Sequence, residues 1–113
     1  MNLIKISLGL IVGVVCGCAN NQLADDSLAE TLSARDILYA PDFVVNAGGL
    51  IHVYKEIRGY GETHARELAL GIERNLEGIL RTADAREITP LAAARAVALE
   101  RLEAADAEQP AAA

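Results

Sequence analysis

Two short polar clusters contain the residue types best suited to binding a small molecule. The first holds Asn20 and Asn21, and the second holds Asn46, Gly48 and Gly49. Side-chain amides can hydrogen-bond a carboxamide, a ribose or a carboxylate without carrying a charge. Paired glycines before a helix let a ligand approach the backbone and the amino end of that helix. Either cluster alone is typical of an ordinary turn, but the two together favour a binding site.

The hydrophobic pattern predicts that both clusters follow strands of one sheet. The apolar run 10–16 is short and rich in β-branched residues, as in a buried parallel strand, and 37–40 is a second such run. A short helix over 27–35, with Asp25 and Asp26 as caps, joins them. Strand, helix, strand is the unit of an α/β sheet, in which ligands bind beyond the carboxyl ends of the strands.

Helices are predicted for most of the remaining chain. One begins at or just after Gly49, where apolar residues recur three and four apart, and ends at Gly59. A longer helix is predicted over 63–84. Thr89 and the proline after it form an N-cap and first-turn pair that begins a last helix. A disordered tail is expected over 105–113.

The other residues that often mark enzymes do not assemble into a site in the sequence. Gly59, Tyr60 and Gly61 are followed by His64 where a dinucleotide loop needs its third glycine, and there is no Walker loop. His52 and His64 have no acidic or thiol residues at a matching ligand spacing, so no metal site is predicted. The sequence does not bring together a nucleophilic residue, a general base and a residue that could orient that base. No catalytic residue is therefore assigned.

Length and charge narrow the kinds of protein this chain can be. Its 113 residues allow one small domain. The net charge of −6 excludes nucleic acid as a partner and disfavours an anionic membrane surface. Hydrophobic residues make up 52% of the chain, which is too apolar for a disordered protein.

The first two dozen residues allow two interpretations. Lys5 and the apolar run after it have the layout of a secretory signal, and the residues before Cys18 look like a lipobox with Cys18 as the lipidated residue. This alternative makes the chain a small lipoprotein, anchored to a membrane, with a binding or structural role. The other interpretation takes the same residues as a buried strand, with Cys16 and Cys18 as buried free thiols.

Two longer strings are similar to one enzyme family. They are ANNQLA at 19–24 and ILYAPDFVVNAGG at 37–49. Both closely resemble the carboxy-terminal part of the leucine/phenylalanine/valine dehydrogenases, which belong to the glutamate dehydrogenase superfamily. The resemblance covers about residues 14–102, most of this chain but only about the last quarter of a family member. On this view the chain is a truncated dehydrogenase, and residues 1–13 are an unassigned apolar leader or a displaced start.

The resemblance implies a fold and a reaction. Residues 14–58 would be the end of a Rossmann-like, NAD-binding α/β domain, containing the last strands of its sheet, and 59–104 would be carboxy-terminal helices. The reaction would be NAD-dependent oxidative deamination of a branched-chain or aromatic L-amino acid to its 2-oxo acid, by a cytoplasmic homo-oligomer. The family's glycine-rich loop and its catalytic lysines and aspartate have no counterpart here, so the chain is expected to be inactive alone.

The resemblance also implies roles for individual residues. The residues of the two polar clusters would contact the cofactor; they are Asn20, Asn21, Asn46, Gly48 and Gly49. Leu50 and Val53 match positions that face the substrate side chain in this family. Aliphatic residues there suit an apolar amino acid. One departure is His52, which stands where Asn or Gln is common.

Overall fold

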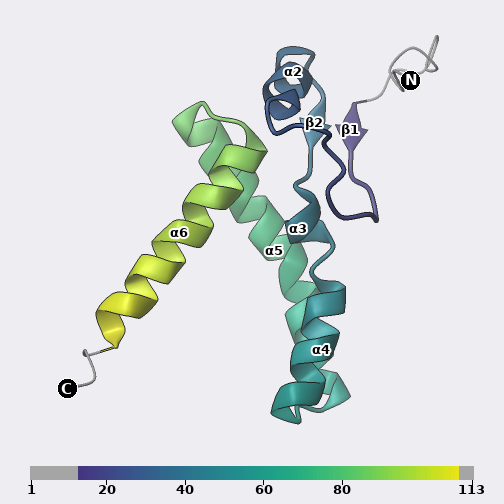
Figure 1. Cartoon of the computed structure of the whole chain (residues 1–113), viewed down its shortest axis with the longest axis vertical. Coiled ribbons are helices and arrows are strands. Elements are labelled where there is room, and N and C mark those ends of the chain that lie inside the picture. The colour runs from purple at the N-terminus through teal and green to yellow at the C-terminus, as the bar shows by residue number, and fades with distance from the viewer. Residues whose placement is uncertain (1–12, 110–113) are drawn as a thin grey trace.

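The structure, a computed structural model, describes residues 13–109 and is mainly helical (Figure 1). Along the chain, a strand, a helix and a second strand are followed by helices only. The elements are β1 (Val14–Val15), α2 (Leu28–Ala34), β2 (Leu38–Tyr39), α3 (Asp42–Val45), α4 (Gly48–Arg58), α5 (Glu62–Arg86) and α6 (Pro90–Glu108).

β1 and β2 form a parallel two-stranded sheet, and α2 lies in the connection between them. The register aligns Val14 with Leu38 and Val15 with Tyr39. This order agrees with the strand–helix–strand unit predicted from the hydrophobic pattern. The strands are shorter than the predicted apolar runs, and residues 10–12 of the first run lie outside the described part of the chain.

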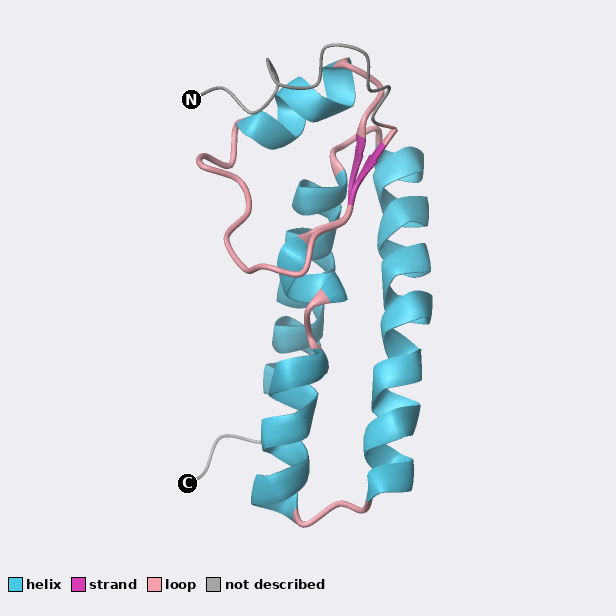
Figure 2. Cartoon of the chain, turned by 90° about the vertical axis from the view of Figure 1, so that its right-hand side faces the viewer, coloured by secondary structure: helices cyan, strands magenta, loops and turns pink. Residues whose placement is uncertain are grey.

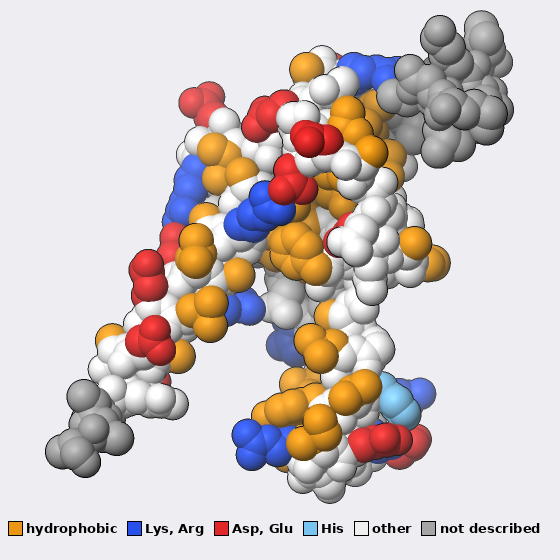
Figure 3. Space-filling view, viewed as in Figure 1, with side chains coloured by type: hydrophobic (Ala, Val, Ile, Leu, Met, Phe, Trp, Pro, Cys, Tyr) orange, Lys and Arg blue, Asp and Glu red, His pale blue; other side chains and the backbone are white. Residues whose placement is uncertain are grey.

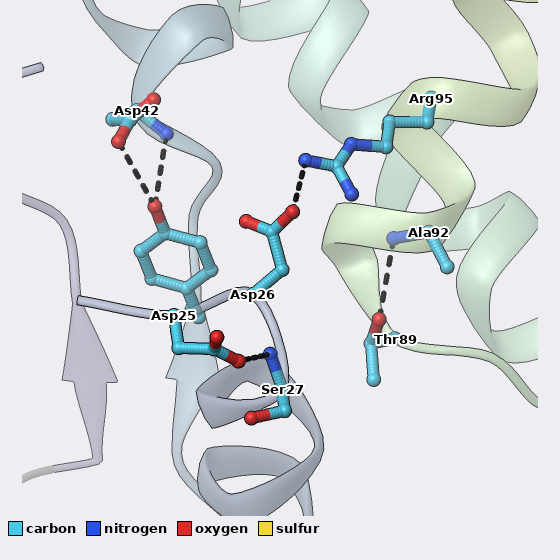
Figure 4. Close-up of polar contacts among 8 residues, drawn as sticks. Asp25, Asp26, Ser27, Asp42, Thr89, Ala92 and Arg95 are labelled. Atoms are coloured by element: carbon cyan, nitrogen blue, oxygen red, sulfur yellow. Dashed lines mark hydrogen bonds and ion pairs between the residues drawn. The ribbon is translucent and has the colours of Figure 1, made fainter. Parts of the chain in front are cut away.

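Acidic side chains hold the segment that leads into α2 (Figure 4). Asp25 Oδ1 accepts a hydrogen bond from the backbone N–H of Ser27 at 2.8 Å. Hydrogen bonding from Ser27 stabilises the carboxylate and lowers the pKa of Asp25 from its ordinary value. Asp26 Oδ2 pairs with an Arg95 guanidinium nitrogen of α6 at 2.7 Å. The acidic pair before α2 therefore also ties this segment to the last helix.

α4, α5 and α6 are the longest elements of the molecule. α4 and α5 are antiparallel neighbours joined by a short turn (Figure 2). Gly59 ends α4 with a φ of 69°, a left-handed conformation that glycine adopts without steric cost. α5 and α6 meet at the turn before Pro90 and diverge toward their other ends (Figure 1).

The core lies where α3 and α6 pack against α5, and it consists mostly of small residues. Its buried members are Ile79, Ala83, Ala93 and Ala94, with Val44 and Val97 packed against them. Alanine side chains allow the α5 and α6 backbones to approach closely. Leu102, in the second half of α6, is 63% exposed. Figure 1 shows α6 diverging from α5 toward its carboxyl end.

Two helices differ from the sequence prediction. The pattern does not predict α3, because Val44 and Val45 are β-branched and favour strands. In the structure the Pro41 carbonyl accepts a hydrogen bond from the Val44 N–H at 3.0 Å and begins a helical turn. α6 continues to Glu108, where a disordered tail was expected from residue 105, because alanine and glutamate favour helices.

The prediction that the two cysteines are buried is wrong. Cys16 and Cys18 are exposed free thiols, not buried ones, because the chain leaves the sheet after Val15 and turns at the surface. Among the helices that the structure describes, none combines the length and the apolar character needed to cross a bilayer.

Replacing Thr89 by alanine is expected to destabilise α6. Thr89 is 4% exposed, and its hydroxyl oxygen accepts a hydrogen bond from the Ala92 N–H at 3.2 Å (Figure 4). Loss of such an N-cap costs about 1 kcal/mol, so the free energy of unfolding measured in urea should fall by that amount. Thr89→Ser keeps the hydroxyl and serves as the matched control. Equal losses in the two variants would contradict the capping role.

Removing the charge of Lys55 is expected to raise the pKa of Glu62. Lys55 Nζ lies 3.0 Å from Glu62 Oε1 across the α4–α5 turn, and its hydrogen bond and charge lower the pKa of Glu62. In Lys55→Gln, a carbon NMR titration should show this pKa returning toward its ordinary value. The folded-state pKa is lowered, so the pair stabilises the fold at higher pH and loses this effect as pH falls through the lowered value. An unchanged Glu62 pKa would refute the interaction.

Candidate functional site

A cleft of about 590 Å³ opens between the turn after β1 and the beginning of α4. Its walls are formed by Asn20, Asn21, Asp42, Phe43, Asn46, Ala47, Gly49, Leu50 and Val53. Every residue for which the sequence predicts a ligand-binding role lines this cleft, except Gly48, which lies beside it in the first turn of α4. The two polar clusters, separate in the sequence, therefore lie together in space.

α3 holds the turn of residues 17–22 through a side chain at its carboxyl end. Asn46 Nδ2 donates hydrogen bonds to the carbonyl oxygens of Gly17 at 3.1 Å and Ala19 at 3.0 Å. A side-chain amide nitrogen has two hydrogens to donate, and both are used here. Asn46 therefore lines the cleft, but only its Oδ1 is left to meet a ligand.

Asp42, at the beginning of α3, holds the same turn from the other side. Its Oδ2 accepts hydrogen bonds from the Gln22 N–H at 3.0 Å and from the Tyr39 hydroxyl at 3.3 Å. Burial raises the pKa of Tyr39, so its hydroxyl stays protonated and donates at neutral pH. Figure 4 shows the contacts between Asp42 and the Tyr39 hydroxyl.

Sequence reasoning missed Asp42 as a residue of the site. The sequence signal for Asp42 was its acidic side chain two residues after the second apolar run, near the carboxyl end of a predicted strand. Ligands in α/β sheets bind beyond such strand ends. Phe43, which follows it, was missed for a different reason, because an apolar residue near a strand end is indistinguishable from a core residue in the sequence.

Two positions constrain the turn, Asn21 through its backbone and Gly17 through its contact with a side chain. Asn21 has a φ of 55°, a left-handed conformation that asparagine tolerates better than most residues. A Cβ atom at Gly17 would collide with the side-chain amide of Gln22. That amide donates a hydrogen bond to the Ala19 carbonyl at 2.7 Å. A larger residue at position 17 would therefore displace Gln22 and disturb the turn.

Side chains on two walls of the cleft remain available to a ligand. Asn20 and Asn21 are exposed, and no hydrogen bond within residues 13–109 engages either side chain. On the other wall, Phe43, Leu50 and Val53 are exposed apolar residues. The cleft therefore offers the amides of Asn20 and Asn21 and an apolar surface, with the Asp42 carboxylate also among its walls.

The histidines lie outside this cleft. His52 Nε2 is 3.5 Å from Glu56 on the exposed side of α4. His64 Nδ1 is 3.7 Å from Glu67, and its ring meets the Tyr60 ring edge-on with centroids 4.5 Å apart. Across residues 13–109, no three His, Cys, Asp or Glu side chains lie close enough to hold a metal ion.

Replacing Asn46 by alanine is expected to loosen the turn without unfolding the molecule. The change removes two hydrogen bonds, each worth about 1 kcal/mol. The backbone amide of Gln22, which donates a hydrogen bond to Asp42, should then exchange hydrogen at least roughly tenfold faster, while α5 and α6 keep their protection. Hydrogen exchange followed by mass spectrometry measures both regions in one experiment.

Asn20→Ala is the matched control for this experiment, because it removes an amide from the same cleft that holds nothing in place. Its exchange rates should equal those of the unaltered chain. If Asn46→Ala also exchanges at the unaltered rate, α3 does not hold the turn.

Comparison with known proteins finds close relatives for most of the chain. It is 44% identical to the valine dehydrogenase of Streptomyces virginiae over 93 residues, which are 82% of this chain and 26% of that enzyme. It is 39% identical to the leucine dehydrogenase of Bacillus subtilis (strain 168) over 90 residues, which are 80% of this chain and 25% of that enzyme. The chain thus spans about a quarter of the length of the curated relatives it matches.

The fold has a counterpart among solved structures. The crystal structure of L-tryptophan dehydrogenase from Nostoc punctiforme matches with a TM-score of 0.80 and 38% sequence identity, over 85% of this chain and 29% of that one. No protein-family model matches the chain. In sequence and in fold, the chain is therefore similar to valine, phenylalanine, leucine and tryptophan dehydrogenases, and the match fits a carboxy-terminal part of such an enzyme.

Proposed function

We propose that the cleft is one side of the active site of an NAD-dependent dehydrogenase that deaminates a branched-chain or aromatic L-amino acid. The observation that carries the proposal is that free asparagine amides and an apolar wall face one cleft, on a chain whose relatives are amino acid dehydrogenases. In this proposal, residues 14–58 are the end of a Rossmann-like domain and 59–104 are carboxy-terminal helices. The whole enzyme is a cytoplasmic homo-oligomer.

The apolar wall of the cleft favours a substrate with an apolar side chain. Phe43, Leu50 and Val53 present an aromatic ring and two aliphatic side chains to the cleft. Contact with such groups stabilises a hydrocarbon side chain and requires no charge. The relatives are named for valine, leucine, phenylalanine and tryptophan, which share an apolar side chain.

The polar side of the cleft fits the nicotinamide end of NAD. Asn20 and Asn21 offer both donors and acceptors, which is what a carboxamide needs. A Cβ atom built on Gly48 or Gly49 would meet no other atom within 4 Å, so the backbone at the beginning of α4 is open to a ligand. When bound, NAD supplies the hydride acceptor of the reaction.

The reaction converts an L-amino acid, NAD⁺ and water into a 2-oxo acid, ammonium, NADH and a proton. In our proposal the described residues bind and orient the reactants. Lys55 does not face the cleft, because it pairs with Glu62 in the last turn of α4, whereas the cleft lies at the first turn. We therefore expect the proton-accepting group to come from another part of the enzyme, and the chain alone to be inactive.

A hybrid enzyme tests the proposed function. The 93 residues of Streptomyces virginiae valine dehydrogenase that match this chain are replaced by the matching residues of this chain. The hybrid should reduce NAD⁺ in the presence of L-valine, L-leucine, L-phenylalanine or L-tryptophan and release ammonium. A hybrid that folds, as judged by circular dichroism and a cooperative melt, but reduces no NAD⁺ with any of these amino acids would contradict the proposal.

Single replacements in the hybrid test the proposed roles of the two sides of the cleft separately. Asn20→Ala should raise the KM for NAD⁺ roughly tenfold, because loss of a hydrogen bond to a ligand costs about 1 kcal/mol or more. Leu50→Ser should raise the KM for the amino acid by about tenfold, through loss of apolar contact. Asn75→Ala is the control, because Asn75 lies on α5 outside the cleft. An equal effect of all three on both KM values would contradict these assignments.

A further inference from the structure

Two free thiols flank a glycine directly after β1. Cys16 and Cys18 are both exposed, and the chain contains no other cysteine. A Cβ atom built on Gly17 would point at the Gln22 side chain, toward the inside of the turn. Because successive side chains of a chain leaving a strand point to opposite sides, Cys16 and Cys18 share the outer side. Figure 3 shows side chains of the colour class that includes cysteine at the surface of this edge of the molecule.

The backbone between the two thiols is free to change its conformation. Residues 16–18 belong to no helix or strand, and no backbone–backbone hydrogen bond within residues 13–109 involves them. The glycine between the cysteines has the widest choice of φ and ψ. Two residues of extended chain separate Cα atoms by roughly 7 Å, whereas a disulfide needs about 5.5–6 Å. A disulfide between the two thiols therefore requires only that the peptide units beside Gly17 rotate.

The same peptide units take part in holding the turn. Asn46 Nδ2 donates hydrogen bonds to the carbonyl oxygens of Gly17 at 3.1 Å and Ala19 at 3.0 Å, one on each side of Cys18. The Gln22 side chain lies against Gly17 and donates to the Ala19 carbonyl at 2.7 Å. Rotation of the Gly17 peptide unit would turn its carbonyl away from Asn46. Closure of a disulfide therefore competes with the hydrogen bonds of the turn.

We propose that Cys16 and Cys18 are a redox modification site, at which a low-molecular-weight disulfide oxidises both thiols to an intramolecular disulfide. One cysteine thiolate attacks a sulfur atom of the oxidant, so that a mixed disulfide forms and one thiol leaves. The second cysteine attacks the mixed disulfide, the bond between the two cysteines forms, and a second thiol leaves. The protein loses two protons and two electrons, and the oxidant takes up both as it becomes two thiols.

Oxidation at this site alters the cleft through the turn. Asn20 and Asn21, which carry the free amides of the cleft, follow Cys18 in the same turn. Without the hydrogen bonds from Asn46, these amides lose their fixed position relative to α4. Exposed or strained disulfides are readily reduced, so excess thiol restores the turn. The inference does not depend on what the cleft binds, because the two states differ in mass and in hydrogen exchange before any ligand is added.

The test treats the folded chain with oxidised glutathione and follows its mass and its hydrogen exchange. The product should be a monomer that is lighter than the reduced chain by two hydrogen atoms. The Gln22 N–H, which Asp42 binds at 3.0 Å, should exchange at least roughly fivefold faster, since loss of one hydrogen bond has about that effect. α5 and α6 should keep their protection, and dithiothreitol should restore the original rate.

Cys18→Ser is the matched control, because it keeps the size of the side chain and leaves a single thiol. Oxidised glutathione should leave its Gln22 exchange rate within about a factor of two of the untreated rate. A final product in which both thiols are free, either cysteine carries glutathione, or two chains are joined would overturn the modification site. An intramolecular disulfide that leaves the Gln22 rate unchanged, or equal acceleration in Cys18→Ser, would overturn the link between oxidation and the turn.

Discussion

The hydrogen bonds from α3 to the turn after β1 connect the sheet to the helical part of the molecule. Asn46 and Asp42 hold the turn from the two ends of α3, and Val44 between them packs against the core of α5 and α6. A helix of four residues is too short to be stable by itself. Its position depends on these side chains and on the hydroxyl of Tyr39, and the shape of the cleft depends on its position.

The helices with strong local signals could be predicted from the sequence. The threonine–proline pair begins α6, Gly59 ends α4, and the apolar spacing of α5 places Ile79 in the core. α3 could not be predicted, because β-branched residues favour strands and its position depends on distant contacts. The bond from Gln22 to Asp42 joins residues 20 positions apart, which no local pattern reveals.

The location of the candidate site could be predicted from the sequence, but the roles of its individual residues could be predicted less well. The rule that ligands bind beyond the carboxyl ends of parallel strands brings the two asparagine clusters together, and they line one cleft. The rule treats all the amides alike, however. Asn46 donates both of its amide hydrogens to carbonyl oxygens of the turn, whereas the side chains of Asn20 and Asn21 make no hydrogen bond within residues 13–109. The exposure of Cys16 and Cys18 also depends on where the chain leaves the sheet.

One short helix forms part of one wall of the cleft and also holds the opposite wall in place. Phe43 of α3 faces the cleft directly, while Asp42 and Asn46 fix the turn that carries the free amides. The spacing between the amide wall and the apolar wall is therefore set by α3. Any change in the position of α3 would move both walls together.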